Sequence, residues 1–256
     1  MPEYLAKMAR GEIDTYTLVH KFGRNTAVGT SIVPVCEGGF YRMPQMSATV
    51  TLAVISDDAD DTAAGAGAQE VTLEYLDSTG AEQTGTIATN GITESTETIA
   101  GVWRLLRAYV SGSGTYADQT VNSQQGTITI RQASAGITWA VIPEIGTTGF
   151  AIAQSLIGCY TVPLGKRAYM LTNTYTVDSN KSGTCYLFAR SNANQLVAPY
   201  SALRVKNIYT GLSGLNKFDH ETNESYPALT DILTMATSPT TADISAEFEL
   251  MVVDDD

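Results

Sequence analysis

The sequence has few of the residues that catalysis and metal binding require. Its 256 residues include two histidines, His20 and His220, and neither lies near a cysteine or a carboxylate at metal-ligand spacing. It contains no HExxH, CxxC or zinc pattern, and no serine within a G-x-S-x-G motif. The sequence therefore offers no catalytic residue, no metal-ligand set and no cofactor-binding motif, and we expect a protein that is not an enzyme.

Charged residues are also scarce, at 16% of the chain, and basic ones are the scarcer kind. Fifteen Lys and Arg against 27 Asp and Glu leave a net charge of -12 and a pI near 4.5. Sequence-independent binding to nucleic acid needs the opposite sign, because its affinity comes from neutralising phosphates. No run reaches the ~18 uncharged apolar residues of a membrane helix, and residues 1–7 lack the apolar core of a signal peptide. We therefore expect neither nucleic acid nor a membrane as a partner.

The three cysteines, Cys36, Cys159 and Cys185, are an odd number at wide spacing. They cannot make a complete disulfide framework. Cys159 and Cys185 both lie in strand-like segments, where a small thiol is readily buried. The favoured interpretation is therefore buried free thiols in a reducing cytoplasm.

Alternating apolar and polar residues dominate the chain from residue 47 onward. The alternation is clear in residues 48–55, 71–76, 126–131 and 243–253. Turn-forming residues separate such segments, and short strands at a spacing of about 8–12 residues are typical of a sandwich or barrel. Residues 102–109 fit a helix or a strand, and their β-branched and aromatic ends favour the strand.

These patterns predict an all-β protein built from two antiparallel modules of β-sandwich or jelly-roll type. Residues 47–145 form the first module and residues 146–256 the second, with the break in a segment rich in glycine and threonine. Residues 1–46 are expected to form an irregular N-terminal arm, because glycines, aromatic residues and basic residues interrupt any regular pattern there.

The arm contains the candidate partner-contact residues. Basic side chains in an otherwise acidic chain fit an acidic neighbour, and aromatic side chains between them supply apolar anchors. An equally weighted alternative is that this segment only covers the first module. The candidate contact residues are Tyr16, His20, Lys21, Phe22, Arg24 and Tyr41.

The sharpest acidic feature is the segment 57–61, with four aspartates in five residues. Carboxylate oxygens are the ligands that Ca²⁺ prefers, but the spacing lacks the calcium-loop pattern with its distant glutamate. A solvated turn between two strands is the favoured interpretation.

Several segments together resemble virion structural proteins of tailed phages, which are frequent in marine and cyanobacterial phages. The most specific is Y-T-L-V-H-K-F-G-R-N at residues 16–25, followed by the Gly-Gly-aromatic stretch at residues 38–41. Residues 71–77, 160–166 and 248–254 are similar to the same group. The resemblance implies a non-enzymatic virion protein, with no catalytic residues or cofactor to transfer to this chain.

Within that group we expect a capsid decoration or cement protein that binds across capsomer seams and stabilises the head. Its partner would be the major capsid protein, and its place the capsid exterior of a virion assembled in the host bacterial cytoplasm. A homo-oligomer is expected, with a trimer favoured because capsids have local three-fold positions. The alternatives are a head–tail adaptor and a tail structural or receptor-binding protein. A glycan-degrading enzyme is a more remote alternative, which would need paired carboxylates ~5–10 Å apart in a pocket.

Overall fold

The computed structural model describes residues 7, 10, 12–13, 16–114, 123–144, 152–220 and 224–255, and all structural statements concern these residues. They are almost entirely β, and the strands named below pair in antiparallel fashion, so the predicted fold class is confirmed. No helix among them is long and apolar enough to cross a membrane. The strands are β1 (Tyr16–Val28), β2 (Val33–Pro34), β3 (Val50–Ser56), β4 (Ala68–Leu76), β5 (Glu82–Ala88), β6 (Ile99–Val102), β7 (Arg104–Ser113), β8 (Ile128–Gln132), β9 (Thr138–Ile142), β10 (Cys159–Thr161), β11 (Lys166–Val177), β12 (Gly183–Arg190), β13 (Arg204–Leu212), β14 (Gly214–Asp219), β15 (Ser225–Tyr226), β16 (Asp231–Thr237) and β17 (Ala242–Asp254); η1 (Glu37–Gly39) and η2 (Met46–Ala48) are short 3-10 helices.

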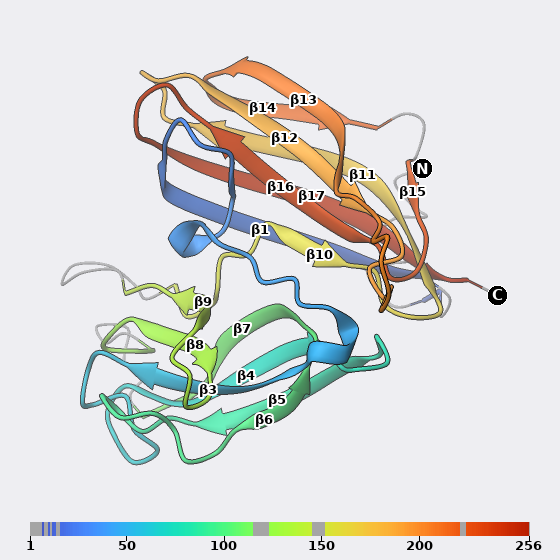
Figure 1. Cartoon of the computed structure of the whole chain (residues 1–256). Coiled ribbons are helices and arrows are strands. Elements are labelled where there is room, and N and C mark those ends of the chain that lie inside the picture. The colour runs from blue at the N-terminus through green and yellow to red at the C-terminus, as the bar shows by residue number, and fades with distance from the viewer. Residues whose placement is uncertain are drawn as a thin grey trace. The chain divides into compact units, whose positions relative to one another are not determined.

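The chain divides into two compact units. Unit 1 combines residues 1–39 with residues 158–256, and unit 2 is formed by residues 40–157. Figure 1 shows the strands of both chain ends, from β1 and from β10 to β17, gathered in unit 1. Unit 1 is therefore discontinuous in sequence.

Unit 1 is a sandwich of two sheets. Sheet A has the strand order β1-β17-β11-β14, with β15 beside β11, and sheet B has the order β10-β16-β12-β13, with β2 beside β16. Buried side chains of both sheets meet in one cluster, in which Tyr175 and Ile244 come from sheet A and Cys185 and Ala236 from sheet B. Along β17, alternate residues from Ala242 to Leu250 are fully buried, as the alternation in the sequence predicts.

The prediction of an irregular arm is wrong for residues 16–28, which form the strand β1. This strand pairs with β17 from Tyr16↔Val253 to Val28↔Ala242 and forms one edge of sheet A. The sequence pattern concealed it because three of its four buried positions, Lys21, Gly23 and Asn25, do not form an apolar row.

Gly23 shows why this inward face contains small and polar residues. A Cβ atom at this position would lie 2.0 Å from the carbonyl oxygen of Val35 and 2.2 Å from the backbone nitrogen of Gly158. The backbone of β1 therefore lies directly against two other segments of unit 1, and only glycine permits that approach.

Unit 2 also has two antiparallel sheets, with the orders β6-β3-β8-β9 and β5-β4-β7. The segment that fitted either a helix or a strand is extended, since β6 ends at Val102 and β7 begins at Arg104. The two tryptophans of the chain, Trp103 and Trp139, are both buried in this unit.

The unit boundaries lie at 39/40 and 157/158, whereas the sequence analysis placed module boundaries at 46/47 and 145/146. The first boundary shifts because β1 and β2 pair with strands of the C-terminal half. The second shifts because residues 152–157 continue to bind unit 2: the backbone N–H of Ser155 donates to the carbonyl of Ala108 at 2.7 Å, and Gln154 bridges to Tyr109.

Candidate functional site

Five of the six candidate contact residues lie on β1, where alternation separates them into two groups. Tyr16, His20, Phe22 and Arg24 point to the outer face of sheet A, whereas Lys21 points inward and is 5% exposed. The sixth residue, Tyr41, is a buried residue of unit 2. Lys21 and Tyr41 therefore offer almost no surface to a partner, and contact through the other four residues stays a prediction.

The basic side chains of the outer face are paired with carboxylates of the neighbouring strand. The Nε2 atom of His20 lies 3.1 Å from Oε1 of Glu247 on β17, and Arg24 forms an ion pair with Asp243 on the same strand. Two of the basic side chains that suggested an acidic partner, His20 and Arg24, thus have carboxylate neighbours within sheet A.

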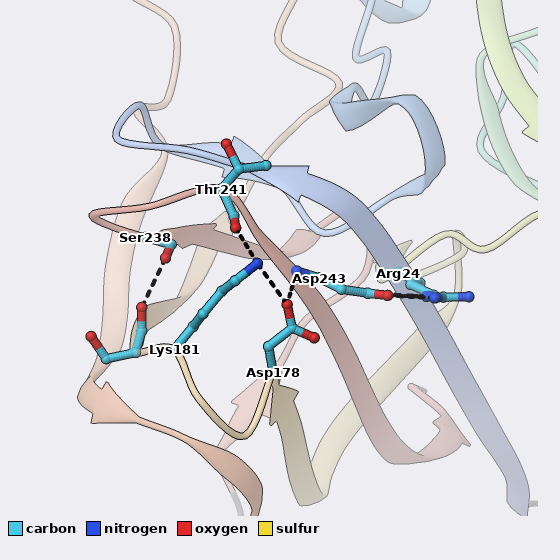
Figure 2. Close-up of polar contacts among 7 residues, drawn as sticks. Arg24, Asp178, Lys181, Ser238, Thr241 and Asp243 are labelled. Atoms are coloured by element: carbon cyan, nitrogen blue, oxygen red, sulfur yellow. Dashed lines mark hydrogen bonds and ion pairs between the residues drawn. The ribbon is translucent and has the colours of Figure 1, made fainter.

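A surface pocket of about 510 Å³ lies at one end of this face. Figure 2 shows the polar network around it: Arg24 Nε donates to both carboxylate oxygens of Asp243 at 3.0 Å, and the Asp243 backbone N–H donates to Asp178 at 3.2 Å. The Nζ atom of Lys181 lies 3.1 Å from the same Asp178 carboxylate and donates to the backbone carbonyl of Thr241 at 2.6 Å. Phe22 contributes an aromatic ring to the pocket lining, and Thr176, Ser179 and Ser245 contribute hydroxyl groups.

The charges around the pocket stabilise one another. The hydrogen bond to Asp243 raises the pKa of Arg24, and the Asp243 backbone N–H together with Lys181 lowers the pKa of Asp178. Burial raises the pKa of the nearby Glu37, and Asp243 adds to that shift while Arg24 opposes it.

The pocket lining contains two carboxylates, Asp178 and Asp243, and the pKa of Asp178 is lowered, whereas a general acid needs a raised pKa. Glu37, whose pKa is raised, is not among the lining residues. Among the described residues there is also no group of three His, Cys, Asp or Glu side chains that could hold a metal ion.

In the acidic segment 57–61, the Asp61 carboxylate has a structural role, so the solvated-turn interpretation is wrong for this residue. This side chain is fully buried and accepts hydrogen bonds from the backbone N–H groups of Ala68, Gln125 and Gly126 at 2.8, 2.9 and 3.0 Å. The hydroxyl of Ser56 donates to it at 2.6 Å. The carboxylate therefore joins three segments of unit 2.

A second exposed feature of unit 1 was missed by the sequence analysis. The loop of residues 191–203 joins β12 to β13 and contains no charged residue, while Arg190 and Arg204 stand at its two ends. All five consecutive residues of its apolar run 196–200 are exposed, and Val197 reaches 78%. The signal in the sequence was this uncharged apolar run, which does not alternate as a strand would.

The strands that this loop connects continue the apolar character on the outer face of sheet B. Tyr186 of β12 is in register with Ile208 of β13, and Phe188 with Val205. Ile208 and Val205 are 55% and 45% exposed on an edge strand. The β12–β13 surface is defined here as Tyr186, Phe188, Leu196, Val197, Tyr200, Val205 and Ile208.

Two ion pairs lie at the border of this surface. Arg190 binds the fully buried Asp231 through two hydrogen bonds of 3.0 and 2.6 Å, and Lys206 lies 2.6 Å from Glu224. The β12–β13 surface is therefore an apolar area bordered by two ion pairs and by the exposed Arg204, on a chain whose net charge is -12.

No family model matches the sequence, and no curated protein matches it. Among solved structures, the chain is similar to a structure of infectious bursal disease virus, Gt strain, at 11% identity over 93% of this chain and 72% of the other, with a TM-score of 0.24. It is also similar to the PBSX exported protein XepA, at 11% identity over 90% of this chain and 86% of the other, with a TM-score of 0.19. At these identities and TM-scores the likenesses carry no argument about function.

Proposed function

We propose that this chain is a virion structural protein, a capsid decoration or cement protein that docks on its shell through the β12–β13 surface. The observation that carries the proposal is the apolar run at residues 196–200, which is exposed along its whole length. Such runs and contiguous apolar patches are uncommon on soluble proteins unless a partner covers them.

The composition of the surface fits a protein partner. Tyr186, Phe188 and Tyr200 are residue types that contribute strongly to interfaces, because a large ring loses little conformational entropy when it is buried. The absence of charge in residues 191–203 also avoids the cost of desolvating an unpaired ion in the centre of an interface.

The net charge of -12 supports the same role. The net charge keeps the free protein soluble before it docks. The β12–β13 surface contains no charged side chain, so its burial on a shell is not opposed by charge repulsion within the surface. The resemblance of residues 16–25 to virion proteins of tailed phages supports the shell of a tailed phage as the docking site and the major capsid protein as the partner. A trimer at local three-fold positions would present three such surfaces together.

Copy number and shell binding test this proposal together. In purified virions we expect a copy number comparable to that of the major capsid protein. About six or twelve copies would instead identify a head–tail adaptor or tail protein, and absence from virions would refute a virion role.

The surface itself is tested by co-sedimentation of the purified chain with shells that lack it. The double variant Val197→Asp, Tyr200→Ser should lose at least ~10-fold in apparent affinity, since it places a charge and removes a ring at the interface centre. Ile92→Asp is the matched control, because Ile92 is 64% exposed but belongs to unit 2. Equal binding of the double variant and the control would refute docking through the β12–β13 surface.

A further inference from the structure

Two of the three cysteines face each other inside unit 1. The Sγ atoms of Cys36 and Cys159 are 3.7 Å apart, and the two residues are 1% and 0% exposed. Cys36 follows β2, and Cys159 is the first residue of β10, so the pair joins the N-terminal part of unit 1 to its C-terminal part. They are 123 positions apart in the sequence, which is why spacing gave no hint of the pair.

Backbone hydrogen bonds hold the two cysteines together. The N–H of Gly158 donates to the carbonyl of Val35 at 3.1 Å, directly before Cys159 and Cys36 in the chain. Val35 N–H in turn donates to Thr234 on β16 at 2.9 Å, and Thr234 N–H donates to Gly158 at 3.1 Å. The neighbourhood of the thiols is therefore fixed by the sheet itself.

This geometry is close to that of a disulfide. A disulfide needs its sulfur atoms at about 2.05 Å, so each Sγ must move by less than about 1 Å from its present position. Side-chain rotation supplies such a movement without separating the backbone bonds around Val35 and Gly158.

We infer that Cys36 and Cys159 are an oxidation site that closes to an intramolecular disulfide when the protein meets a peroxide. One thiol is oxidised to a sulfenic acid as hydrogen peroxide is reduced to water. The other thiol then displaces the hydroxyl group as a second water, so that two thiols and one peroxide give one disulfide and two waters. Because the thiolate is the reacting form and both residues are buried, the first step is slow and needs local opening.

Cys185 provides an internal control. It is fully buried in the core cluster of unit 1, and burial raises its pKa to about 12. We therefore expect it to stay a free thiol under conditions that link Cys36 to Cys159.

The test uses the full chain, treated with hydrogen peroxide or kept reduced, then denatured and alkylated. The oxidised chain should carry one alkyl group where the reduced chain carries three, together with a loss of about 2 Da before alkylation. Peptide mapping should find the bond between Cys36 and Cys159. Cys36→Ser and Cys159→Ser should each keep two alkylatable thiols, and Cys185→Ser should still form the bond.

The cross-link should also stabilise unit 1, because it closes a long loop in the unfolded chain. We expect the melting temperature of unit 1 to rise by about 10 °C on oxidation, and no rise in Cys36→Ser. Three alkyl groups after oxidation, peroxide oxidation of Cys36 or Cys159 beyond the sulfenic acid, or a bond that includes Cys185 would overturn the inference. These outcomes are independent of shell binding, so the failure of one proposal leaves the other to its own experiment.

Discussion

Asp61→Ala should destabilise unit 2 strongly, because one buried carboxylate satisfies donors from three separate segments. The alanine would leave the N–H groups of Ala68 and Gly126 buried without their acceptor, and that of Gln125 half-buried without it. The Ser56 hydroxyl would lose its acceptor as well.

The expected size of the effect follows from these contacts. A buried donor that loses its partner costs about 1–3 kcal/mol. Two fully buried N–H groups and one half-buried N–H group give about 4 kcal/mol in the free energy of unfolding, close to the upper end for single substitutions. Asp61→Asn keeps one acceptor oxygen and should cost about half as much, because its amide nitrogen then faces the donors Ser56 and Gly126.

Tryptophan fluorescence during urea denaturation measures this effect in the right unit, since Trp103 and Trp139 both lie in unit 2. With an m-value of about 2 kcal/mol/M, the midpoint should fall by about 2 M for Asp61→Ala and about 1 M for Asp61→Asn. Asp60→Asn is the matched control, because Asp60 is an exposed neighbour in the same segment. Equal urea midpoints for Asp61→Ala and Asp60→Asn would show that the Asp61 carboxylate does not stabilise unit 2 as its hydrogen bonds indicate.

Three further predictions concern unit 1. Burial raises the pKa of Cys185 to about 12 and raises that of Tyr226 well above its ordinary value, so both groups favour the folded state while protonated. The stabilisation from these groups is complete below pH ~9 and is lost as the pH rises towards 12. Urea denaturation followed by circular dichroism should show that the free energy of unfolding has fallen by about 2 kcal/mol by pH 10.5 because of Cys185. In Cys185→Ala this part of the pH dependence should be absent. Gly23→Ala should unfold unit 1 or cost at least ~3 kcal/mol by the same assay, because the new methyl group meets backbone atoms that cannot move aside. Arg24→Ala should cost only about 0.5–1 kcal/mol, since its ion pair with Asp243 is partly exposed, and the difference should shrink in 1 M NaCl.

The strands with an apolar inward row could be predicted from the sequence, and β1 could not. In β17, the residues at alternate positions from Ile244 to Leu250 are apolar, and the structure buries them. In β1 the buried positions hold Lys21 and Gly23, whose burial depends on neighbours far away in the chain. The discontinuity of unit 1 has the same origin, because the pairing of β1 with β17 leaves no local signal.

The candidate contact residues show a similar division. Once residues 16–25 are known to be a strand, its period of two separates Phe22 and Arg24 from Lys21 without further information. The carboxylates that pair with this face, Asp243 and Glu247, could not be predicted, because they come from the other end of the chain. The apolar run 196–200 was visible in the sequence, but only the structure shows that its residues are exposed.

The two outer faces of the unit 1 sandwich have opposite chemical character, which bears on how the protein would sit on a shell. The outer face of sheet A has ion pairs such as Arg24–Asp243, and a solvated ion pair has little free energy to gain from burial against a partner. The outer face of sheet B has the exposed Val205 and Ile208 beside an uncharged loop, and these side chains gain free energy when water is removed from them. Because the two sheets pack through their inner faces, the proposed docking would place sheet B against the shell and sheet A towards the solution. The contact predicted from the sequence for the outer face of β1 would then not form with that shell. A charge placed at Val197 should therefore impair docking, whereas loss of the Arg24 ion pair should leave it unchanged.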